Sequence, residues 1–303
     1  GIYFCILLSL VKNMEQNNKK ATTHSIGIYL WIWGLLFVFS TFSYGQYTEG
    51  NTVMIWSSYK FKESLEGVEG ASTKDWKESF TEYYSKRNKK EKYLKSSLFL
   101  RHYWTGASYD YHEVNEFANM DDASKWASNQ PALNQKAWPN KDKRSEAISA
   151  VNKYRQTGYH KDTHVWENHP RYMKKRKKSK TPESTVVTVV TNYWKPLSKV
   201  EGGTSEEREK LMDKFFKQVT MKNNNILSQR VVTHYWSDHI DNGQWPLTYI
   251  REWNSIVDAD DTETEAKLVE KAFSKDEQKA LGKYWAGKHE DIGVFSNDTA
   301  FNK

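Results

Sequence analysis

The sequence predicts an α+β protein in which one β-α-β-β-α-β unit occurs twice in tandem. Segments of alternating β-branched and aromatic residues, typical of strands, are interleaved with segments whose apolar residues recur at helical spacing. Similar segments also recur in the same order, 129 to 136 residues apart, which chance rarely produces. The matching pairs are 52–59 with 186–193, Glu69-Gly70 with Glu201-Gly202, His102-Tyr103-Trp104 with His234-Tyr235-Trp236, Val114-Asn115-Glu116-Phe117 with Ile250-Arg251-Glu252-Trp253, Ala137-Trp138 with Ala272-Phe273, Tyr154 with Tyr284, and His160-Lys161-Asp162 with His289-Glu290-Asp291.

The first half begins with a predicted strand at 52–60, where β-branched and aromatic residues alternate. Aromatic residues at helical spacing then predict a helix at 73–88, with Ser72 or Thr73 as its N-cap. The remaining predicted elements are strands at 94–104 and 109–117, helices at 121–129 and 142–156 on either side of the helix-breaking Trp138-Pro139, and a short last strand at 163–166.

The second half repeats the order of the first. This order is that of a ferredoxin-like unit, an antiparallel sheet with its helices on one face. The other face must also be buried, and a second copy of the unit is the expected cover. The predicted elements are strands at 185–193, 226–236, 247–253 and 292–295, and helices at 205–219, 256–272 and 275–286.

The N-terminal segment is predicted to lie outside the fold. Residues before Met14 are expected to be an upstream extension, and the apolar stretch at 26–42 follows a polar region. Ser43 and Gly45 provide small side chains at the −3 and −1 positions of a signal peptidase site before Gln46. We therefore expect cleavage after residue 45 and export to the periplasm or the medium. An uncleaved membrane anchor is the alternative.

Composition narrows the class of protein. A mean hydropathy of −0.85 excludes a multi-span membrane protein, whereas 13 Trp, 18 Tyr and 13 Phe can build aromatic cores. The single cysteine, Cys5, lies before Met14. Beyond the predicted signal peptide, the sequence therefore excludes structural disulfides, thiolate metal sites and a cysteine nucleophile.

A basic segment separates the two halves. Residues 171–180 read RYMKKRKKSK and are followed by Thr181-Pro182. Such a segment repels itself and lacks apolar anchors, which predicts a solvated linker. Nucleic acid is not the expected partner of an exported protein. The expected division is 1–45 as upstream extension plus signal peptide, 46–170 as the first repeat, 171–183 as the basic linker and 184–303 as the second repeat.

Three repeated motifs resemble the dimeric α+β barrel superfamily, in particular exported members from Bacteroidetes-type bacteria. The resemblance covers roughly residues 50–168 and 184–296. It implies that the two repeats form an intramolecular pseudo-dimeric α+β barrel in a monomeric chain, with a ligand cavity between them. The superfamily mixes monooxygenases, haem enzymes, dehalogenation-associated proteins and binding modules, so no single reaction is implied. The motifs are the strand end His-Tyr-Trp at 102–104 and 234–236, the strand end Glu116-Phe117 or Glu252-Trp253, and the helix start Asp121-Asp122-Ala123 or Asp258-Ala259-Asp260.

Two histidines at equivalent strand positions are the first catalytic candidates. Because side chains alternate across a strand, His102 shares a face with Leu100, and His234 shares one with Val232. The two imidazoles are candidates for a general acid/base pair or for ligands of a metal or haem. The alternative is a hydrogen-bonded residue at a strand end, because no second ligand follows at metal-type spacing. A slip of one residue in the strand register would reverse these faces.

Two further histidines precede an aspartate by two residues. His160 with Asp162, and His289 with Asp291, stand before the last predicted strand of each half. In an extended segment the two side chains of each pair point the same way, as an acid/base pair requires. A pair that caps a turn would look identical.

The sequence offers weaker signals for a metal and for an aromatic ligand. Asp238-His239-Ile240-Asp241 could begin a metal site, but a polar hairpin is the simpler interpretation and no metal is predicted. No G-x-S-x-G, P-loop, G-x-G-x-x-G or H-E-x-x-H motif is present. Six aromatic residues on predicted strands are expected either to build the barrel core or to bind a ligand: Tyr59, Trp104, Phe117, Tyr193, Trp236 and Trp253.

Three functions remain open after these observations. The first is an exported protein that binds a small, partly apolar molecule between the repeats, with no cofactor predicted. The second is an enzyme in the same cavity, either a cofactor-independent oxygenase or a haem-type enzyme, with His102 or His234 as acid/base or ligand. The third is a non-catalytic interaction protein of the cell envelope whose cavity is filled. Whether the chain is an enzyme stays undecided.

Overall fold

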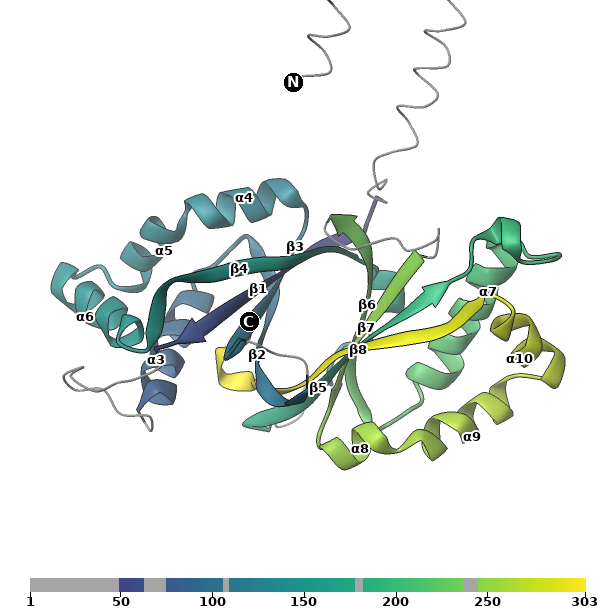
Figure 1. The fold of residues 1–303 in the computed structure, drawn as a ribbon. Coiled ribbons are helices and arrows are strands. Elements are labelled where there is room, and N and C mark those ends of the chain that lie inside the picture. The colour runs from purple at the N-terminus through teal and green to yellow at the C-terminus, as the bar shows by residue number, and fades with distance from the viewer. Residues whose placement is uncertain (1–48, 63–74, 106–108, 178–181, 237–244) are drawn as a thin grey trace, which may run out of the picture. The chain divides into compact units, whose positions relative to one another are not determined.

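Eight antiparallel strands close into a barrel in the computed structural model (Figure 1). The strand order is β1-β3-β2-β8-β5-β7-β6-β4, so each half contributes four neighbouring strands, and the pairs β2–β8 and β4–β6 join the halves. The predicted succession of strands and helices is confirmed. The strands are β1 (Thr52–Phe61), β2 (Leu94–Thr105), β3 (Tyr111–Phe117), β4 (Arg155–Asn168), β5 (Ser184–Trp194), β6 (Ile226–Trp236), β7 (Trp245–Trp253) and β8 (Trp285–Asp298).

The helices lie outside the barrel, in one group on each side (Figure 1). Polar side chains at five helix starts accept a hydrogen bond from the backbone and so satisfy one of the free N–H groups there. These N-caps are Asn119, Asn140, Thr204, Ser255 and Asp261, and Ser274 adds a reciprocal capping box with Glu277. The helices are α3 (Trp76–Asn88), α4 (Met120–Ser128), α5 (Gln130–Ala137) and α6 (Lys141–Asn152) in the first half, and α7 (Ser205–Phe215), α8 (Ile256–Asp260), α9 (Thr262–Ala272) and α10 (Lys275–Gly282) in the second, with a π turn at Phe216–Thr220 after α7 and short 3-10 turns at Pro170–Tyr172, Leu197–Lys199 and Thr299–Phe301.

The structure describes residues 49–62, 75–105, 109–177, 182–236 and 245–303. The predicted signal peptide, the proposed N-caps Ser72 and Thr73, and the Asp238-His239-Ile240-Asp241 segment lie outside these ranges. Within them, no helix has the length and apolar character needed to cross a membrane.

The last strand of each half is much longer than predicted. The strands β4 and β8 have 14 residues each, where the sequence predicted only 163–166 and 292–295. Both strands bend at a bulge, where Thr163 and Ile292 have no partner in the register of β1 and β5. Both also contain a glycine with positive φ, Gly158 at 80° and Gly287 at 75°, close to a second irregularity. The strands continue through polar stretches that contain a glycine. The sequence pattern of such stretches is typical of loops, so the strands were predicted too short.

The middle of the barrel is filled by apolar side chains from both halves. Trp56, Trp166 and Phe295 are at most 2 % exposed. Trp56 packs edge to face against the other two rings, with ring centroids 5.4 to 5.6 Å apart. Such packing leaves no room for a ligand between the halves at this level. The prediction of a ligand cavity between the repeats is therefore wrong for the middle of the barrel. The other members of this inner cluster are Met54, Leu98, Leu100, Val114, Val187, Val189, Val232 and Ile250.

The basic segment between the halves is anchored over residues 171–176, which corrects the predicted solvated linker. Lys174 is 8 % exposed, and its ammonium donates to the carbonyls of Thr220 and Asn223 at 3.0 and 2.6 Å. Arg171 pairs with carboxylates of α7, and Arg176 pairs with Glu252. Carboxylates and carbonyls of the second half supply the anchors that this segment itself lacks.

The six aromatic candidates do not share one location. Trp104 and Trp236 are 64 % and 53 % exposed, so they do not belong to the core, and their alternative role in binding a ligand stays a prediction. Phe117 is buried against Trp126 of α4, and Tyr59 stacks on Tyr111. Tyr193 and Trp253 are also buried, and Trp253 faces the helices of the second half.

Candidate functional site

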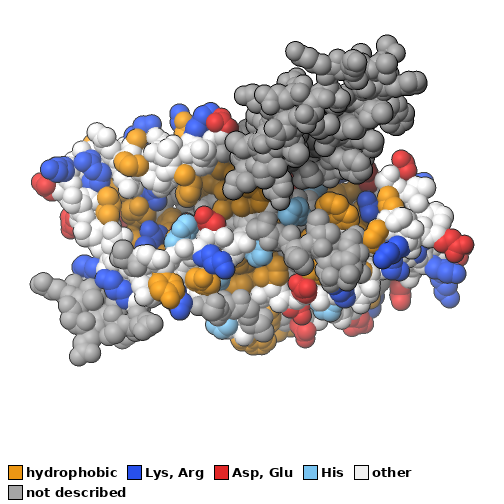
Figure 2. All heavy atoms as spheres, turned by 45° about the horizontal axis from the view of Figure 1, so that its top comes forward, with side chains coloured by type: hydrophobic (Ala, Val, Ile, Leu, Met, Phe, Trp, Pro, Cys, Tyr) orange, Lys and Arg blue, Asp and Glu red, His pale blue; other side chains and the backbone are white. Residues whose placement is uncertain are grey.

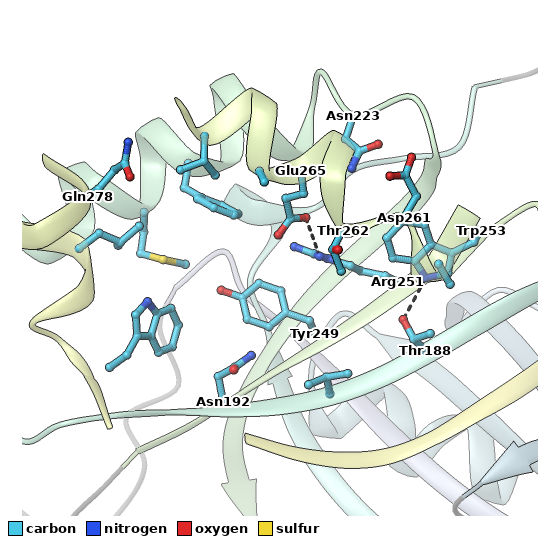
Figure 3. A pocket seen from close by; sticks show the side chains of 18 of the residues that line it. Thr188, Asn192, Asn223, Tyr249, Arg251, Trp253, Asp261, Thr262, Glu265 and Gln278 are labelled. Atoms are coloured by element: carbon cyan, nitrogen blue, oxygen red, sulfur yellow. Dashed lines mark hydrogen bonds and ion pairs between the residues drawn. The ribbon is translucent and has the colours of Figure 1, made fainter. Parts of the chain in front are cut away.

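A cavity of about 650 Å³ lies between the outer face of the second half's sheet and its helices (Figure 3). Strands β5 and β7 form its floor, because their side chains alternate between the barrel interior and this outer face. Its size and its mixture of aromatic walls with a few polar groups are those of a small-molecule site. The lining includes Thr188, Val190 and Asn192 of β5, Tyr249, Arg251 and Trp253 of β7, Met212 and Phe215 of α7, Asp261, Thr262, Glu265, Ala266, Val269 and Glu270 around α9, and Gln278, Leu281 and Trp285.

The corresponding space in the first half is filled. Glu113 and Asn115 of β3 occupy the register positions that Tyr249 and Arg251 occupy in β7, and the pocket beside them measures only about 30 Å³. An aromatic cluster packs the rest of the interface between sheet and helices. Its buried members are Phe80, Tyr83, Tyr84, Phe99, Tyr111, Trp138, Tyr154 and Phe301, together with Val151.

Arg251 is the central charged group of the cavity. Its Nη1 donates to Glu265 Oε2 at 2.8 Å (Figure 3). Its Nε donates to Gln229 Oε1 at 2.8 Å, so the guanidinium is held from both sides. The guanidinium also lies 5.2 Å from the centre of the Tyr249 ring. Two partners and an aromatic ring fix its position before any ligand arrives, which reduces the entropy lost on binding.

The remaining polar groups of the lining are also held in place. Trp253 Nε1 donates to Thr188 Oγ1 at 2.9 Å, which fixes the indole against the floor (Figure 3). Asp261 accepts from Asn225 and from the start of α9, and these hydrogen bonds lower its pKa. Burial raises the pKa of Tyr249 well above its ordinary value, so its hydroxyl stays a neutral donor.

The lining does not fit a haem. Haem iron in proteins takes a His, Cys, Met or Tyr ligand. Among the described residues around the cavity there is neither His nor Cys. Tyr249 is the tyrosine of the lining, but its raised pKa opposes the phenolate form, and Met212 would have no imidazole opposite it. The residues described around this cavity therefore offer haem iron no suitable ligand.

His102 and His234 lie on opposite sides of the barrel. His102 lies near the end of β2 and is exposed. His234 on β6 is half-buried, and its buried Nδ1 lacks a hydrogen-bond partner among the described residues. Three strands separate β2 from β6 in either direction around the barrel. The structure thus places the two histidines symmetrically, and neither lines the cavity of the second half.

The two His-Asp pairs form as the spacing predicted. His160 Nε2 lies 2.9 Å from Asp162 Oδ1, and His289 Nε2 lies 3.7 Å from Asp291 Oδ2. All four side chains are at least half exposed, so water screens both pairs. Neither pair reaches the cavity of the second half.

Two histidines that the sequence did not single out lie inside the barrel. His112 is 4 % exposed, and its Nδ1 contacts Trp56 Nε1 at 2.9 Å and Ser58 Oγ at 2.8 Å. His164 stacks on Trp166 with ring centroids 4.7 Å apart.

Figure 2 shows hydrophobic and His side chains near the middle of one face and Lys and Arg side chains toward both sides. Among the described residues, no three His, Cys, Asp or Glu side chains are placed to bind a metal ion.

Arg251 and Glu265 were also missed by the sequence patterns. The sequence comparison pairs Val114-Asn115-Glu116-Phe117 with Ile250-Arg251-Glu252-Trp253. The signal that could have identified Arg251 is that it replaces Asn115 of the first half and stands between two aromatic residues of the outer face, Tyr249 and Trp253. The partner, Glu265, comes from a helix, so no strand pattern could have paired it with Arg251.

Comparison with protein-family models and with curated protein sequences found no match. Solved structures similar to the chain include a candidate monooxygenase from Fusobacterium nucleatum subsp. nucleatum, with 10% identity, a TM-score of 0.41, and coverage of 83% of this chain and 93% of that one. A chlorite dismutase variant from Candidatus Nitrospira defluvii has 9% identity, a TM-score of 0.43, and coverage of 84% and 93%. An anthrone oxidase-like protein has 7% identity, a TM-score of 0.37, and coverage of 82% and 91%.

At this level of likeness the names of these proteins do not transfer to the chain. The closed barrel of eight antiparallel strands with outer helices itself confirms the predicted α+β barrel. The resemblance to exported members from Bacteroidetes-type bacteria stays a prediction.

Proposed function

We propose that the chain binds a small, partly apolar molecule in the cavity between β5, β7 and the helices of the second half. The observation that supports this is the contrast between the halves. Aromatic side chains fill this interface in the first half, whereas the second half keeps a cavity of about 650 Å³ around a positioned arginine. Unfilled space next to a core forgoes packing energy, so a retained cavity favours a binding role.

The lining points to a neutral or weakly cationic ligand with an apolar body. Phe215, Tyr249, Trp253 and Trp285 offer aromatic surface. Of the charged residues in the lining, one is basic and three are acidic, and Arg251 is already paired with Glu265. A strongly anionic ligand would meet net negative charge there. The basic and acidic residues are Arg251 and Asp261, Glu265 and Glu270.

A neutral fluorescent dye tests the location of binding. Nile red should bind residues 46–303 with one site. Ala266 lies at the exposed rim of the cavity, so Ala266→Trp on α9 should weaken dye binding by about tenfold or more, because the indole would cover part of the entrance. Ala132→Trp on α5 adds the same ring to an exposed position of the first half and serves as the matched control. If Ala266→Trp binds the dye as tightly as the unchanged chain does, the cavity is not the site. If the chain binds neither the dye nor a co-purified compound, the result would favour the alternative of a non-catalytic interaction protein.

A cofactor-independent oxygenase in the same cavity is the second candidate, and Arg251 is the feature that favours it. A fixed guanidinium stabilises an enolate or phenolate that forms from a bound substrate. Glu265 accepts a hydrogen bond from Arg251 at 2.8 Å and would be the base that takes the proton from the substrate. Native mass spectrometry would identify the retained compound, and a dioxygen electrode would follow its oxidation. Glu265→Gln should keep binding and lose turnover by about 10² or more. Binding without any dioxygen uptake by the unchanged chain would reject this candidate.

We also propose that the two halves are tandem ferredoxin-like repeats and that the chain is exported after cleavage before Gln46. Matching bulges at Thr163 and Ile292, and matching glycines at Gly158 and Gly287, support the duplication. The small residues at Ser43 and Gly45 support the cleavage site. Intact-mass measurement of protein exported by a bacterial host tests the second point, because a mature chain that begins elsewhere than Gln46 would contradict it.

A further inference from the structure

A second cavity, of about 490 Å³, lies at one end of the barrel and has a different chemistry. Its lining comes from β2, β3, β6 and β7, from the anchored segment 173–176 and from the C-terminal residues Thr299, Asn302 and Lys303. It shares no lining residue with the cavity proposed above for the apolar molecule. Six basic and two acidic side chains surround it: Lys95, Lys174, Lys175, Arg176, Arg230 and Lys303, and Glu116 and Glu252.

The two carboxylates of this cavity are buried and fully hydrogen-bonded. Glu116 and Glu252 are 4 % and 3 % exposed. Each accepts hydrogen bonds from a threonine, a serine and an asparagine that come from three other strands of the same half. Glu116 accepts from Thr52 at 2.8 Å, Ser96 at 2.6 Å and Asn168 at 3.2 Å, and Glu252 accepts from Thr185 at 2.6 Å, Ser228 at 2.8 Å and Asn297 at 2.9 Å.

Each carboxylate faces one arginine. Arg176 donates to both oxygens of Glu252 through Nε and Nη2. Arg230 Nη2 donates to Ser96 Oγ at 3.0 Å, and its Nε lies 3.9 Å from Glu116 Oε2. That Nε is buried and has no hydrogen-bond partner among the described residues. A buried, unsatisfied donor on a charged group is costly, so a ligand oxygen that accepts from it would stabilise the site.

Arg176 and Arg230 also line the same cavity. Burial, and after it the positive charge of Arg230, lower the pKa of Arg176. Neither arginine follows from the duplication. Leu98 of β2 occupies the register position that Arg230 occupies in β6, and Arg176 comes from the segment between the halves. The arginines therefore add positive charge to a repeated frame of carboxylate, threonine, serine and asparagine.

We propose that this end of the barrel binds a small oxyanion, a carboxylate or phosphate group, between Arg176 and Arg230. Arginine forks match both groups in geometry and charge. Lys95 and Lys175 are exposed at the rim and attract the anion, whereas the ammonium of Lys174 is already bound to backbone carbonyls. The packed layer around Trp56 and Trp166 closes the barrel beyond the site, so the ligand binds at the end and does not pass through.

Calorimetric titration with inorganic phosphate and, separately, with succinate tests the site at low ionic strength. We expect one site for the unchanged chain. The anion that binds more tightly identifies whether the site prefers a phosphate or a carboxylate group. Arg176→Gln and Arg230→Lys should each weaken binding by about tenfold or more, the second because a lysine keeps the charge but loses the fork. Arg171→Gln is the matched control, because Arg171 belongs to the same segment and pairs with two carboxylates outside this cavity.

Three outcomes would overturn the proposal. The first is no heat of binding for either anion at about 10 mM. The second is equal weakening by Arg171→Gln, which would indicate an effect of net charge. The third is unchanged binding in Arg176→Gln and Arg230→Lys. Thermal unfolding checks that each variant folds, and Arg176→Lys replaces Arg176→Gln if that variant does not.

Discussion

His112 gives the barrel a pH-dependent stability at the scale of one residue. Burial, and then the charges of His102 and His164, lower its pKa to about 4. In the unfolded chain the pKa returns to about 6.5. Between these values the unfolded chain binds a proton that the folded chain does not, so the free energy of unfolding falls as the pH drops from about 6.5 to about 4. The difference in pKa corresponds to about 3 kcal/mol.

Urea unfolding of the unchanged chain and of His112→Asn at several pH values checks this prediction. Asparagine keeps an acceptor near Trp56 Nε1 and Ser58 Oγ but does not titrate. The variant should be less stable at pH 7, because a smaller side chain leaves a cavity. Its free energy of unfolding should fall less between pH 6.5 and pH 4 than that of the unchanged chain. Parallel pH profiles would show that His112 is not the group responsible.

The sequence predicted on which face of a strand a side chain lies better than it predicted which side chains of other strands surround it. Alternation correctly placed His234 on the same face as Val232, because the side-chain period of a strand is local. Alternation could not show that Glu116 and Glu252 are buried, since their hydrogen-bond partners come from other strands. Trp104 was expected in the core or at a ligand, and it is exposed because it lies in a bulge of β2 where Tyr103 and Trp104 have no partner in the register of β8.

At the scale of elements, α3 and α7 should respond differently to truncation of a buried side chain. Phe80 of α3 is fully buried and contacts seven aromatic rings, so Phe80→Ala should cost about 3–5 kcal/mol. Met212 of α7 borders the cavity of the second half, and Met212→Ala should cost less than half of that. Denaturant unfolding measures both. Equal losses would mean that the cavity is not open beside α7.

The boundary of an element was predictable where residues next to it in the sequence determine it. It was not predictable where pairing with a distant strand determines it. The start of α7 follows from Thr204, a side chain that caps its own helix. The lengths of β4 and β8 depend on partners in β1 and β5, so the polar residues around Gly158 and Gly287 concealed them. Anchoring of the basic segment likewise depends on Glu252 and on carbonyls far away in the sequence.

At the scale of the whole barrel, the two halves should unfold as one unit. Trp56 and Trp166 of the first half share a core with Val187, Ile250 and Phe295 of the second. Opening either half would expose this core and leave the strand edges of the other half unpaired. Native-state hydrogen exchange should therefore give peptides from β3 and β7 the same opening free energy, within about 1 kcal/mol.

The substitution Phe80→Ala makes that test sharper, because six of the seven rings around Phe80 belong to the first half and none belongs to β7. The seventh ring, Phe301, lies in the C-terminal turn after β8. If the barrel opens as a unit, the slowest-exchanging amides of β7 should lose as much protection as those of β3, by the same 3–5 kcal/mol expected from unfolding. If β3 alone loses protection, the halves are separate cooperative units that happen to touch. Their shared core would then stabilise a contact between domains and not the closure of one barrel, and a ligand bound in the second half would stabilise only that half.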